Sequence, residues 1–419
     1  MDRAPADGAF AVCVPDLPGA PAVCDRAGYG GTAWQRRRLE QLLAAPPREL
    51  GSGPVRAAGS DPRARQGEPL AGGARVRGAQ AHVACPGRAG WGYLQQLRVC
   101  PVLRGAGYHP RRRLHVDITL DWLGCATFRL TLGETVVFLD AYMDRVPSAP
   151  KVGLSAKDVD RADFVLVGHA HFDHIAGAET IAKNTGARII GSHESCRVMR
   201  EQGVPGGQLL PAQGGERYRL APEVTVRVFP SLHSCTWTTG SLSAMEPSLG
   251  DLGLCEDERA AMAAQRGLGS TIGRRSGAGD TAASELREHL ANAVGSGHTG
   301  GALAYLVETP RGSIFWQDTS GCWTGVLGQL RPDVAILAAA GRGNIDGEPI
   351  QGSLADFVAR EAELLQPKTV VLGHHDNWMP PITPEGGTDV APIRAALAAK
   401  TPGARLLEPG YMEGTALLR

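Results

Sequence analysis

The chain has 419 residues, and 43 lysine and arginine residues balance 43 aspartate and glutamate residues, so the formal net charge is zero. This balance gives no sign of a general nucleic-acid-binding surface, and nucleic acid is not expected as a partner. No apolar run is long enough to span a membrane, residues 1–30 lack the pattern of a signal peptide, and the nine cysteines have no regular spacing. We therefore expect a cytoplasmic protein with reduced thiols.

Residues 1–113 differ sharply in composition from the rest of the chain. They contain no lysine, isoleucine or asparagine, and arginine, alanine, glycine and proline dominate them. Such a segment has little with which to build a core, so we expect it to be disordered. Three interpretations stay open: a basic, flexible interaction tail, a small separate domain, or translation from upstream of the true start, in which case the segment is not part of the native protein. We expect one catalytic domain at 114–419.

From residue 118 onward, the pattern of apolar residues becomes regular. Three short strands are predicted at residues 118–123, 127–132 and 135–140, with turns at Gly124 and Gly133. Strand-like and helix-like segments then alternate. Further strands are expected at 164–168, 187–190, 224–229, 302–308, 313–316, 334–337 and 369–372, and helices directly after His174 and at 354–365 and 391–399. This order predicts a mixed α/β (α+β) fold in which two sheets lie between helices.

The segment at about 238–300 has a different character and is interpreted as a helical insertion. Residues 255–266 and 281–294 have helical patterns, and a stretch rich in glycine and arginine separates them. Because the segment begins soon after His233, it could fold over a neighbouring site as a lid. A solvent-facing helical decoration explains the pattern equally well.

The stretch His169-Ala-His171-Phe-Asp173-His174 directly follows a short apolar run at 164–168. Imidazole nitrogen and carboxylate oxygen are ligands that suit zinc and related metals. His169 and His171 are two residues apart, so they can face the same side of an extended segment. Asp173 and His174 lie where the chain turns and can reach a second metal. The alternative is a histidine-rich loop in which Asp173 caps a helix.

His-x-His-x-Asp-His after an apolar strand resembles the signature of the metallo-β-lactamase-fold hydrolases. Downstream, His233, Asp318 and His374 resemble the third histidine, the bridging aspartate and the last histidine of that superfamily, in the expected order. The resemblance implies a four-layer αββα sandwich. The segments 122–128 and 138–140 and the final His-His-Asp most resemble the branch that includes ascorbate 6-phosphate lactonase-like and N-acylphosphatidylethanolamine phospholipase D-like proteins. Relatives often carry histidine where this chain has Cys125.

The resemblance also implies how the ligands divide between two metals. Metal one would be held by His169, His171 and His233, and metal two by Asp173, His174 and His374, with Asp318 bridging them. Two Zn²⁺ ions are expected, with manganese or iron as alternatives. Two cations that share a water lower its pKa from about 15.7 towards 7, which supplies a hydroxide nucleophile for a small ester, lactone or phosphodiester. Asp173 and Asp318 are the expected catalytic residues, and Asp173 could also assist proton movement.

Three further histidines are candidates for contacts with a small-molecule substrate. His193 follows a predicted strand, and His298 stands at the end of the insertion. His375 competes with His374 for the ligand position, and we favour His374 because it comes first after the strand that ends at Gly373. A structural or surface role is the alternative for each of the three.

Two other functions remain open for this sequence. The first is an iron-dependent oxidoreductase on the same fold, and the second is a metal-binding sensor without turnover. Histidine at position 171 weighs against redox chemistry, because the diiron oxygen-reducing relatives usually carry glutamate there. The complete set of ligand residues weighs against a sensor. A metal-dependent hydrolase is therefore the function that the sequence favours.

Overall fold

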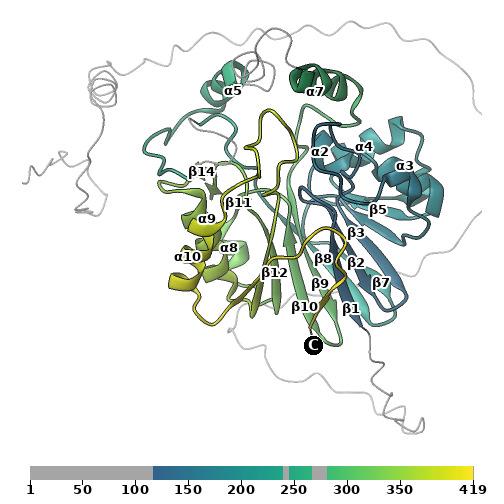
Figure 1. Cartoon of the computed structure of the whole chain (residues 1–419). Coiled ribbons are helices and arrows are strands. Elements are labelled where there is room, and N and C mark those ends of the chain that lie inside the picture. Colours follow the sequence, from purple (N-terminus) through teal and green to yellow (C-terminus); the bar gives the residue numbers. More distant parts are fainter. Residues whose placement is uncertain (1–116, 239–244, 267–280, 419) are drawn as a thin grey trace, which may run out of the picture. The chain divides into compact units, whose positions relative to one another are not determined.

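The computed structural model describes residues 117–238, 245–266 and 281–418 (Figure 1). The expectations for residues 1–113 and for the boundary near Arg113 lie outside these ranges, as does the glycine- and arginine-rich stretch of the insertion. Within the described ranges, no helix combines the length and the apolar character needed to cross a membrane.

The first sheet has seven strands in the order β17-β1-β2-β3-β4-β5-β6. The strands from β17 to β3 pair antiparallel, and those from β3 to β6 pair parallel. Their bounds are β1 (Ile118–Trp122), β2 (Phe128–Leu132), β3 (Thr135–Leu139), β4 (Phe164–Leu166), β5 (Arg188–Gly191), β6 (Leu209–Pro211) and β17 (Thr415–Leu417).

The second sheet also has seven strands, in the order β16-β15-β12-β10-β9-β8-β7. The strands from β7 to β10 pair antiparallel, and β10, β12, β15 and β16 pair parallel, so this sheet repeats the pattern of the first. Their bounds are β7 (Arg217–Ala221), β8 (Val224–Pro230), β9 (Leu303–Thr309), β10 (Gly312–Gln317), β12 (Val334–Ala338), β15 (Thr369–Gly373) and β16 (Arg405–Leu407).

A small third sheet and the helices complete the described fold. The small sheet consists of β11 (Gly321–Cys322), β13 (Asn344–Ile345) and β14 (Glu348–Pro349). The helices are α2 (Phe172–Ile175), α3 (Ala178–Thr185), α4 (His193–Glu201), α5 (Glu256–Arg266), α7 (Thr281–Asn292), α8 (Thr324–Leu327), α9 (Leu354–Leu365) and α10 (Ala391–Lys400), with 3-10 turns η1 (Ala156–Asp158) and η2 (Gly206–Gln208).

The alternation of apolar side chains along the strands creates four layers. In β3, Val137 and Leu139 point into the core between the sheets, while Val136 and Phe138 point outward towards α3 and α4. The second sheet packs its outer face against α9 and α10. Figure 1 shows α3 and α4 on one side of the two sheets and α9 and α10 on the other. The predicted αββα sandwich is therefore confirmed.

The parallel strands of both sheets end at one edge of the sandwich, and this edge positions the candidate ligands. β4 is followed by the loop with His169 and His171, β10 by Asp318, and β15 by His374. The Tyr305 hydroxyl of the second sheet donates to the carbonyl of Val167 (2.7 Å), just after β4 in the first sheet. α5 and α7, which the sequence predicts as helices, lie over this same edge (Figure 1).

The structure differs from the predicted elements in two respects. The helix expected directly after His174 is divided, because Gly177 adopts a φ of 101° between α2 and α3, a backbone conformation that glycine tolerates best. The sequence also gave no indication of several short elements, including β16, β17 and α4. β16 and β17 have three residues each, too few for a clear alternation of apolar and polar positions.

One buried carboxyl lies beneath the loop that carries Asp318. Glu361 of α9 is fully buried, and its Oε1 accepts a hydrogen bond from Gln317 Nε2 at 2.9 Å. The same amide nitrogen lies 2.7 Å from the carbonyl oxygens of Thr319 and Gly321. Burial raises the pKa of Glu361 well above its ordinary value of 4.5, and the hydrogen bond from Gln317 opposes the rise.

This raised pKa predicts how stability depends on pH. The stability that protonated Glu361 contributes is fully present below the pKa of this group in the unfolded state. It is lost as the pH rises towards the pKa of Glu361 in the folded state. Glu361→Gln removes the ionisation. Its free energy of unfolding, relative to wild type, should therefore rise with pH above about 4.5, by at most about 1.4 kcal/mol per pH unit. Urea denaturation at several pH values measures this difference.

Glu363→Gln is the matched control, because Glu363 lies on the same helix with its side chain 42% exposed. Its stability curve should run parallel to that of wild type above about pH 5, where an exposed glutamate is already ionised. A Glu361→Gln curve that also runs parallel to wild type would contradict this account.

Candidate metal centre

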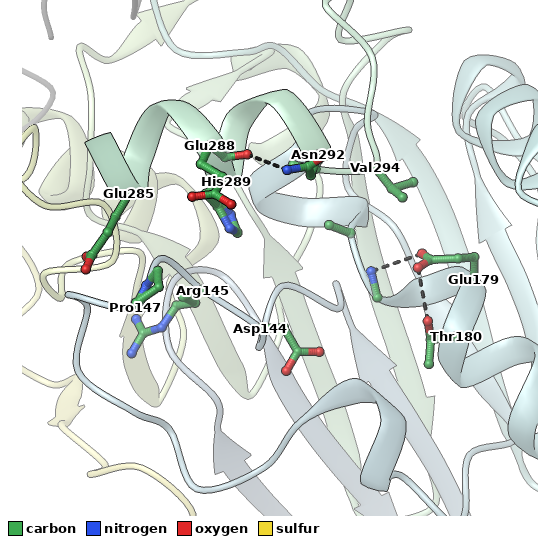
Figure 2. Close-up of a pocket in the computed structure, with 13 residues that line it drawn as sticks. Asp144, Arg145, Pro147, Glu179, Thr180, Glu285, Glu288, His289, Asn292 and Val294 are labelled. Atoms are coloured by element: carbon green, nitrogen blue, oxygen red, sulfur yellow. Dashed lines mark hydrogen bonds between the residues drawn. The ribbon is translucent and has the colours of Figure 1, made fainter. Parts of the chain in front are cut away.

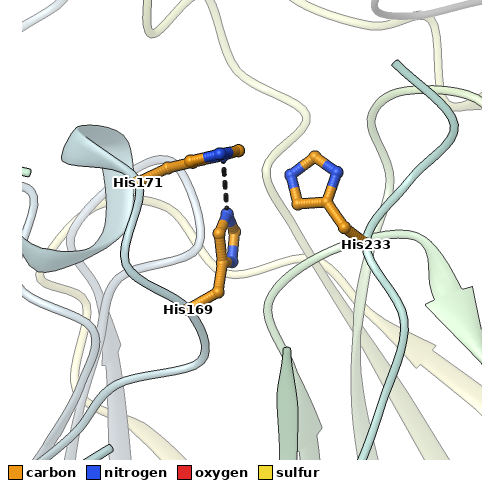
Figure 3. A group of neighbouring side chains, drawn as sticks. All are labelled: His169, His171 and His233. Carbon is orange, nitrogen blue, oxygen red and sulfur yellow. Dashed lines mark hydrogen bonds between the residues drawn. The ribbon is translucent and has the colours of Figure 1, made fainter. Parts of the chain in front are cut away.

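Three histidine side chains meet at the edge where the strands end. His169 and His171 come from the loop after β4, and His233 comes from the segment after β8 (Figure 3). His169 Nε2 lies 3.1 Å from His171 Nδ1, and the centroid of the His233 ring lies 4.7 Å and 4.8 Å from those of His169 and His171. One ring nitrogen from each lies within 4.8 Å of the others. The three imidazoles predicted to share a metal are thus close together.

A second group lies beside these histidines. Asp173 Oδ2 is 3.3 Å from His174 Nε2 and 3.6 Å from His374 Nε2. His174 belongs to α2, whereas His374 directly follows β15 of the other sheet, with a φ of 63°. All three residues are at most 8% exposed. The residues predicted to hold the second metal are therefore also close together.

Asp318 lies between the two groups and is fully buried. Its Oδ2 is 2.6 Å from His169 Nδ1 and 3.3 Å from His174 Nδ1. This close approach depends on Gly168: a Cβ atom added there would lie 1.9 Å from Asp318 Oδ2. Only glycine at position 168 leaves room for the carboxylate, which belongs to the other sheet.

Asp140 is a residue of the site whose role the sequence did not reveal. It directly follows β3, and its Oδ2 lies 2.7 Å from His174 Nδ1, while its Oδ1 accepts a hydrogen bond from Gly168 N at 2.9 Å. These contacts fix the His174 ring with Nε2 towards Asp173. In the sequence, the available signal for this residue is a carboxylate at the end of an apolar predicted strand.

Burial keeps three of the histidines uncharged. Burial, assisted by the neighbouring histidines, lowers the pKa of His171 to about 3 and that of His233 to about 4. The pKa of His169 is also lowered, by burial first and then by His174 and His233. A neutral imidazole offers a nitrogen lone pair, which is the form that binds a metal.

Carboxylates surround His174 in the second group and favour the charged form of its imidazole. Burial lowers the pKa of His174, but Asp173, Asp140 and Asp318 outweigh burial and raise it well above the ordinary value. Burial raises the pKa of Asp173, but His174 and His374 outweigh burial and hold it well below its usual range. The three buried carboxylates therefore stabilise positive charge at this position.

A cavity of about 450 Å³ opens onto the two groups. His171, Asp173, His174, His233 and His374 line it on one side. Phe172, Trp378 and Met379 add an apolar wall, and Ala263 of α5 also borders the cavity. Part of the insertion therefore lines the space beside the candidate ligands.

A second cavity of about 470 Å³ lies against α7 (Figure 2). Its carboxylates include Asp144, Glu179 and Glu285, and its Arg145 is paired with Asp376. None of the residues that line it belongs to the two groups of candidate ligands. We therefore assign the first cavity, and not this one, to the chemistry of the site.

The three histidines proposed to contact substrate lie outside the wall of the first cavity. His193 is exposed at the start of α4, and His298 is exposed in the loop before β9, although its neighbours Ser296 and Gly297 border the cavity. The ring of His375 stacks on Trp122 with centroids 4.5 Å apart. His374, and not His375, lies beside Asp173.

Comparison with known proteins points to the region that carries the candidate ligands. A family model described as a beta-lactamase superfamily domain matches residues 135–251, which include the His-x-His-x-Asp-His stretch and His233. Within residues 135–251 the chain is therefore similar to the beta-lactamase superfamily domain.

Two curated relatives of this chain carry the name UPF0173 metal-dependent hydrolase. The one from Pyrobaculum arsenaticum is 33% identical over 117 residues, which is 27% of this chain and 50% of the relative. The one from Anaeromyxobacter dehalogenans is 34% identical over 124 residues, which is 28% of this chain and 44% of the relative. The chain thus spans about half the length, or less, of these curated relatives.

A solved structure with a similar arrangement is Igni18, a metallo hydrolase from Ignicoccus hospitalis. It has a TM-score of 0.45 and 16% identity, and covers 72% of this chain and 97% of its own. The diiron β-hydroxylase CmlA from Streptomyces venezuelae has a TM-score of 0.45 and 13% identity, and covers 73% of this chain and 54% of its own.

The contact between Gly168 and Asp318 yields a test of the candidate metal centre. Gly168→Ala should displace the Asp318 carboxylate, because the new Cβ cannot share its space. We expect the affinity for zinc to fall at least about tenfold, since losing even a residue that only hydrogen-bonds to a metal ligand costs that much. Gly207→Ala is the control, because a Cβ there meets nothing within 4 Å. Zinc titration with circular dichroism measures binding and folding, and unchanged zinc affinity in Gly168→Ala would contradict the role of this contact.

Proposed function

We propose that this chain is a hydrolase that uses two divalent cations, preferably zinc, to cleave a small ester, lactone or phosphodiester. The observation that carries the proposal is the convergence of two ligand groups, His169, His171 and His233 on one side and Asp173, His174 and His374 on the other, with Asp318 between them. Both groups face one cavity. Its size is that of a pocket for a small molecule.

Buried atoms without partners support the fit of cations to these residues. Asp318 Oδ1 and both ring nitrogens of His374 are buried and have no hydrogen-bond partner. Such atoms cost about 1–3 kcal/mol each when left unsatisfied, so their presence together calls for a ligand. Nitrogen and oxygen donors in this mixture suit zinc, with manganese and iron as alternatives.

Two cations held here would lower the pKa of a shared water and polarise the carbonyl or phosphoryl oxygen of the substrate. The chain supplies the remaining requirements. Asp140 Oδ2 orients His174, and the Gly168 backbone donates to Asp140 Oδ1, so the position of this imidazole is set before substrate arrives. Asp318 joins the two ligand groups through its contacts with His169 and His174.

Asp173 is the carboxylate best placed to handle a proton. Its side chain is 11% exposed and lines the cavity, whereas Asp140 and Asp318 are fully buried. In the proposed reaction Asp173 helps to hold the second cation and assists the movement of a proton from the attacking water towards the leaving group. The aromatic faces of Phe172 and Trp378 exclude water beside the scissile bond and favour a substrate with an apolar group there.

The proposal is tested with the zinc-loaded full chain and matched panels of lactones, aryl esters and aryl phosphodiesters. Wild type should hydrolyse one of the three substrate classes. Asp318→Asn should be at least about a hundredfold slower, because a bridging ligand contributes more than a residue that only hydrogen-bonds to a ligand. Asp389→Asn, an exposed aspartate at the start of α10, is the matched control. It should keep the wild-type rate.

Circular dichroism and thermal melting show whether Asp318→Asn is folded. A folded Asp318→Asn protein with the wild-type rate would overturn the role of this aspartate. A zinc-loaded wild type that leaves all three classes intact would overturn the proposed reaction.

A further inference from the structure

We propose that the Cys125 thiol is a further ligand at the second metal position, beside Asp173 and His374, and that its sulfur makes this position selective for zinc over manganese. The inference rests on the metal centre proposed above and assigns a residue that the resemblance did not place among the ligands. It follows from the position of the sulfur, from unpartnered donors around it, and from the preferences of metals for sulfur.

The position of the sulfur is the first observation. Cys125 is fully buried, and its Sγ, one carboxylate oxygen of Asp173 and one ring nitrogen of His374 all lie within 4.8 Å of one another. The thiol also lies 3.5 Å from the carbonyl oxygen of Asp173. Among the described residues, this is one of three such clusters, and the other two contain only histidine and aspartate.

The backbone around Cys125 is fixed by contacts from both sheets. The carbonyl of Cys125 accepts hydrogen bonds from Trp122 Nε1 (3.0 Å) and from the backbone nitrogen of His374 (2.6 Å). The amide of Cys125 donates to Asp376 Oδ1 at 3.0 Å. Cys125 has a φ of 48°, a conformation that costs energy in a residue with a Cβ. The loop after β1 and the loop after β15 therefore hold cysteine and histidine together.

His374 provides the second, independent observation. Its side chain is 10% exposed, and neither ring nitrogen has a hydrogen-bond partner. Its Nε2 lies 3.6 Å from Asp173 Oδ2. An imidazole so deeply buried with both nitrogens unsatisfied indicates a ligand in the space that it shares with Asp173 and Cys125.

The chemistry of sulfur explains the proposed selectivity. A cation that binds the thiol displaces its proton to solvent, so a sulfur–metal bond forms as the sulfur–hydrogen bond breaks. Thiolate is a soft ligand that zinc and cobalt accept well, whereas manganese prefers oxygen donors. With Asp173, His174 and His374 alone the second position would have only nitrogen and oxygen donors. Cys125 changes this balance towards zinc.

X-ray absorption on the zinc-loaded wild-type chain tests the inference without any substitution. With two zinc ions bound, one sulfur at about 2.3 Å from one zinc should appear among nitrogen and oxygen neighbours near 2.0–2.1 Å. Replacing zinc with cobalt should give a thiolate-to-cobalt charge-transfer band in the near ultraviolet. Two zinc ions with only nitrogen and oxygen neighbours would overturn the role of Cys125 and leave the proposed hydrolase standing. Failure to bind any metal would overturn both.

Cys125→Ser identifies the sulfur, and Cys196→Ser is the matched control. Cys196 is buried in α4 and belongs to none of the ligand clusters. The sulfur signal and the cobalt band should disappear in Cys125→Ser and persist in Cys196→Ser. Cys125→Ser should also bind the second zinc at least about tenfold more weakly, with a smaller loss for manganese. Equal losses for the two metals, or a sulfur signal that persists in Cys125→Ser, would contradict the proposal.

Discussion

The approach of the Asp318 carboxylate to Gly168 is the constraint on which the rest of the site depends. Gly168 ends the segment after β4 in the first sheet, and Asp318 follows β10 in the second, so this contact joins the two halves of the sandwich at the candidate metal centre. The same glycine donates its backbone N–H to Asp140, which in turn holds His174. A side chain at position 168 would therefore disturb both the proposed bridging carboxylate and the orientation of a ligand.

Each of the two sheets places a buried aspartate at their common edge. In each sheet a set of antiparallel strands is followed by parallel ones, and the strands that join the two sets, β3 and β10, are each followed by a buried aspartate, Asp140 or Asp318. Asp173 adds a third carboxylate, and all three surround His174 and raise its pKa. These buried carboxyl groups favour a cation at this position, while the neutral imidazoles opposite supply lone pairs.

Much of the fold follows from local patterns that the sequence displays. Alternating apolar residues predicted the main strands, and their order predicted two sheets between helices. The four-layer sandwich that the resemblance implied is confirmed. Four layers form because side chains on both faces of each sheet need a layer to cover them. The spacing of His169, His171, Asp173 and His174 indicated a metal site because these residues are close in sequence. Contacts between distant segments could not be predicted in this way. Cys125 meets Asp173 across 48 positions, and its amide meets Asp376 across 251, so the cluster around this thiol exists only in the folded chain.

Anomalous X-ray diffraction from crystals of the zinc-loaded chain tests the two-metal centre most directly. Two anomalous peaks should appear, one among His169, His171 and His233 and one beside Asp173 and His374, with Asp318 between them. A single peak, no peak, or peaks away from these side chains would contradict the two-metal centre.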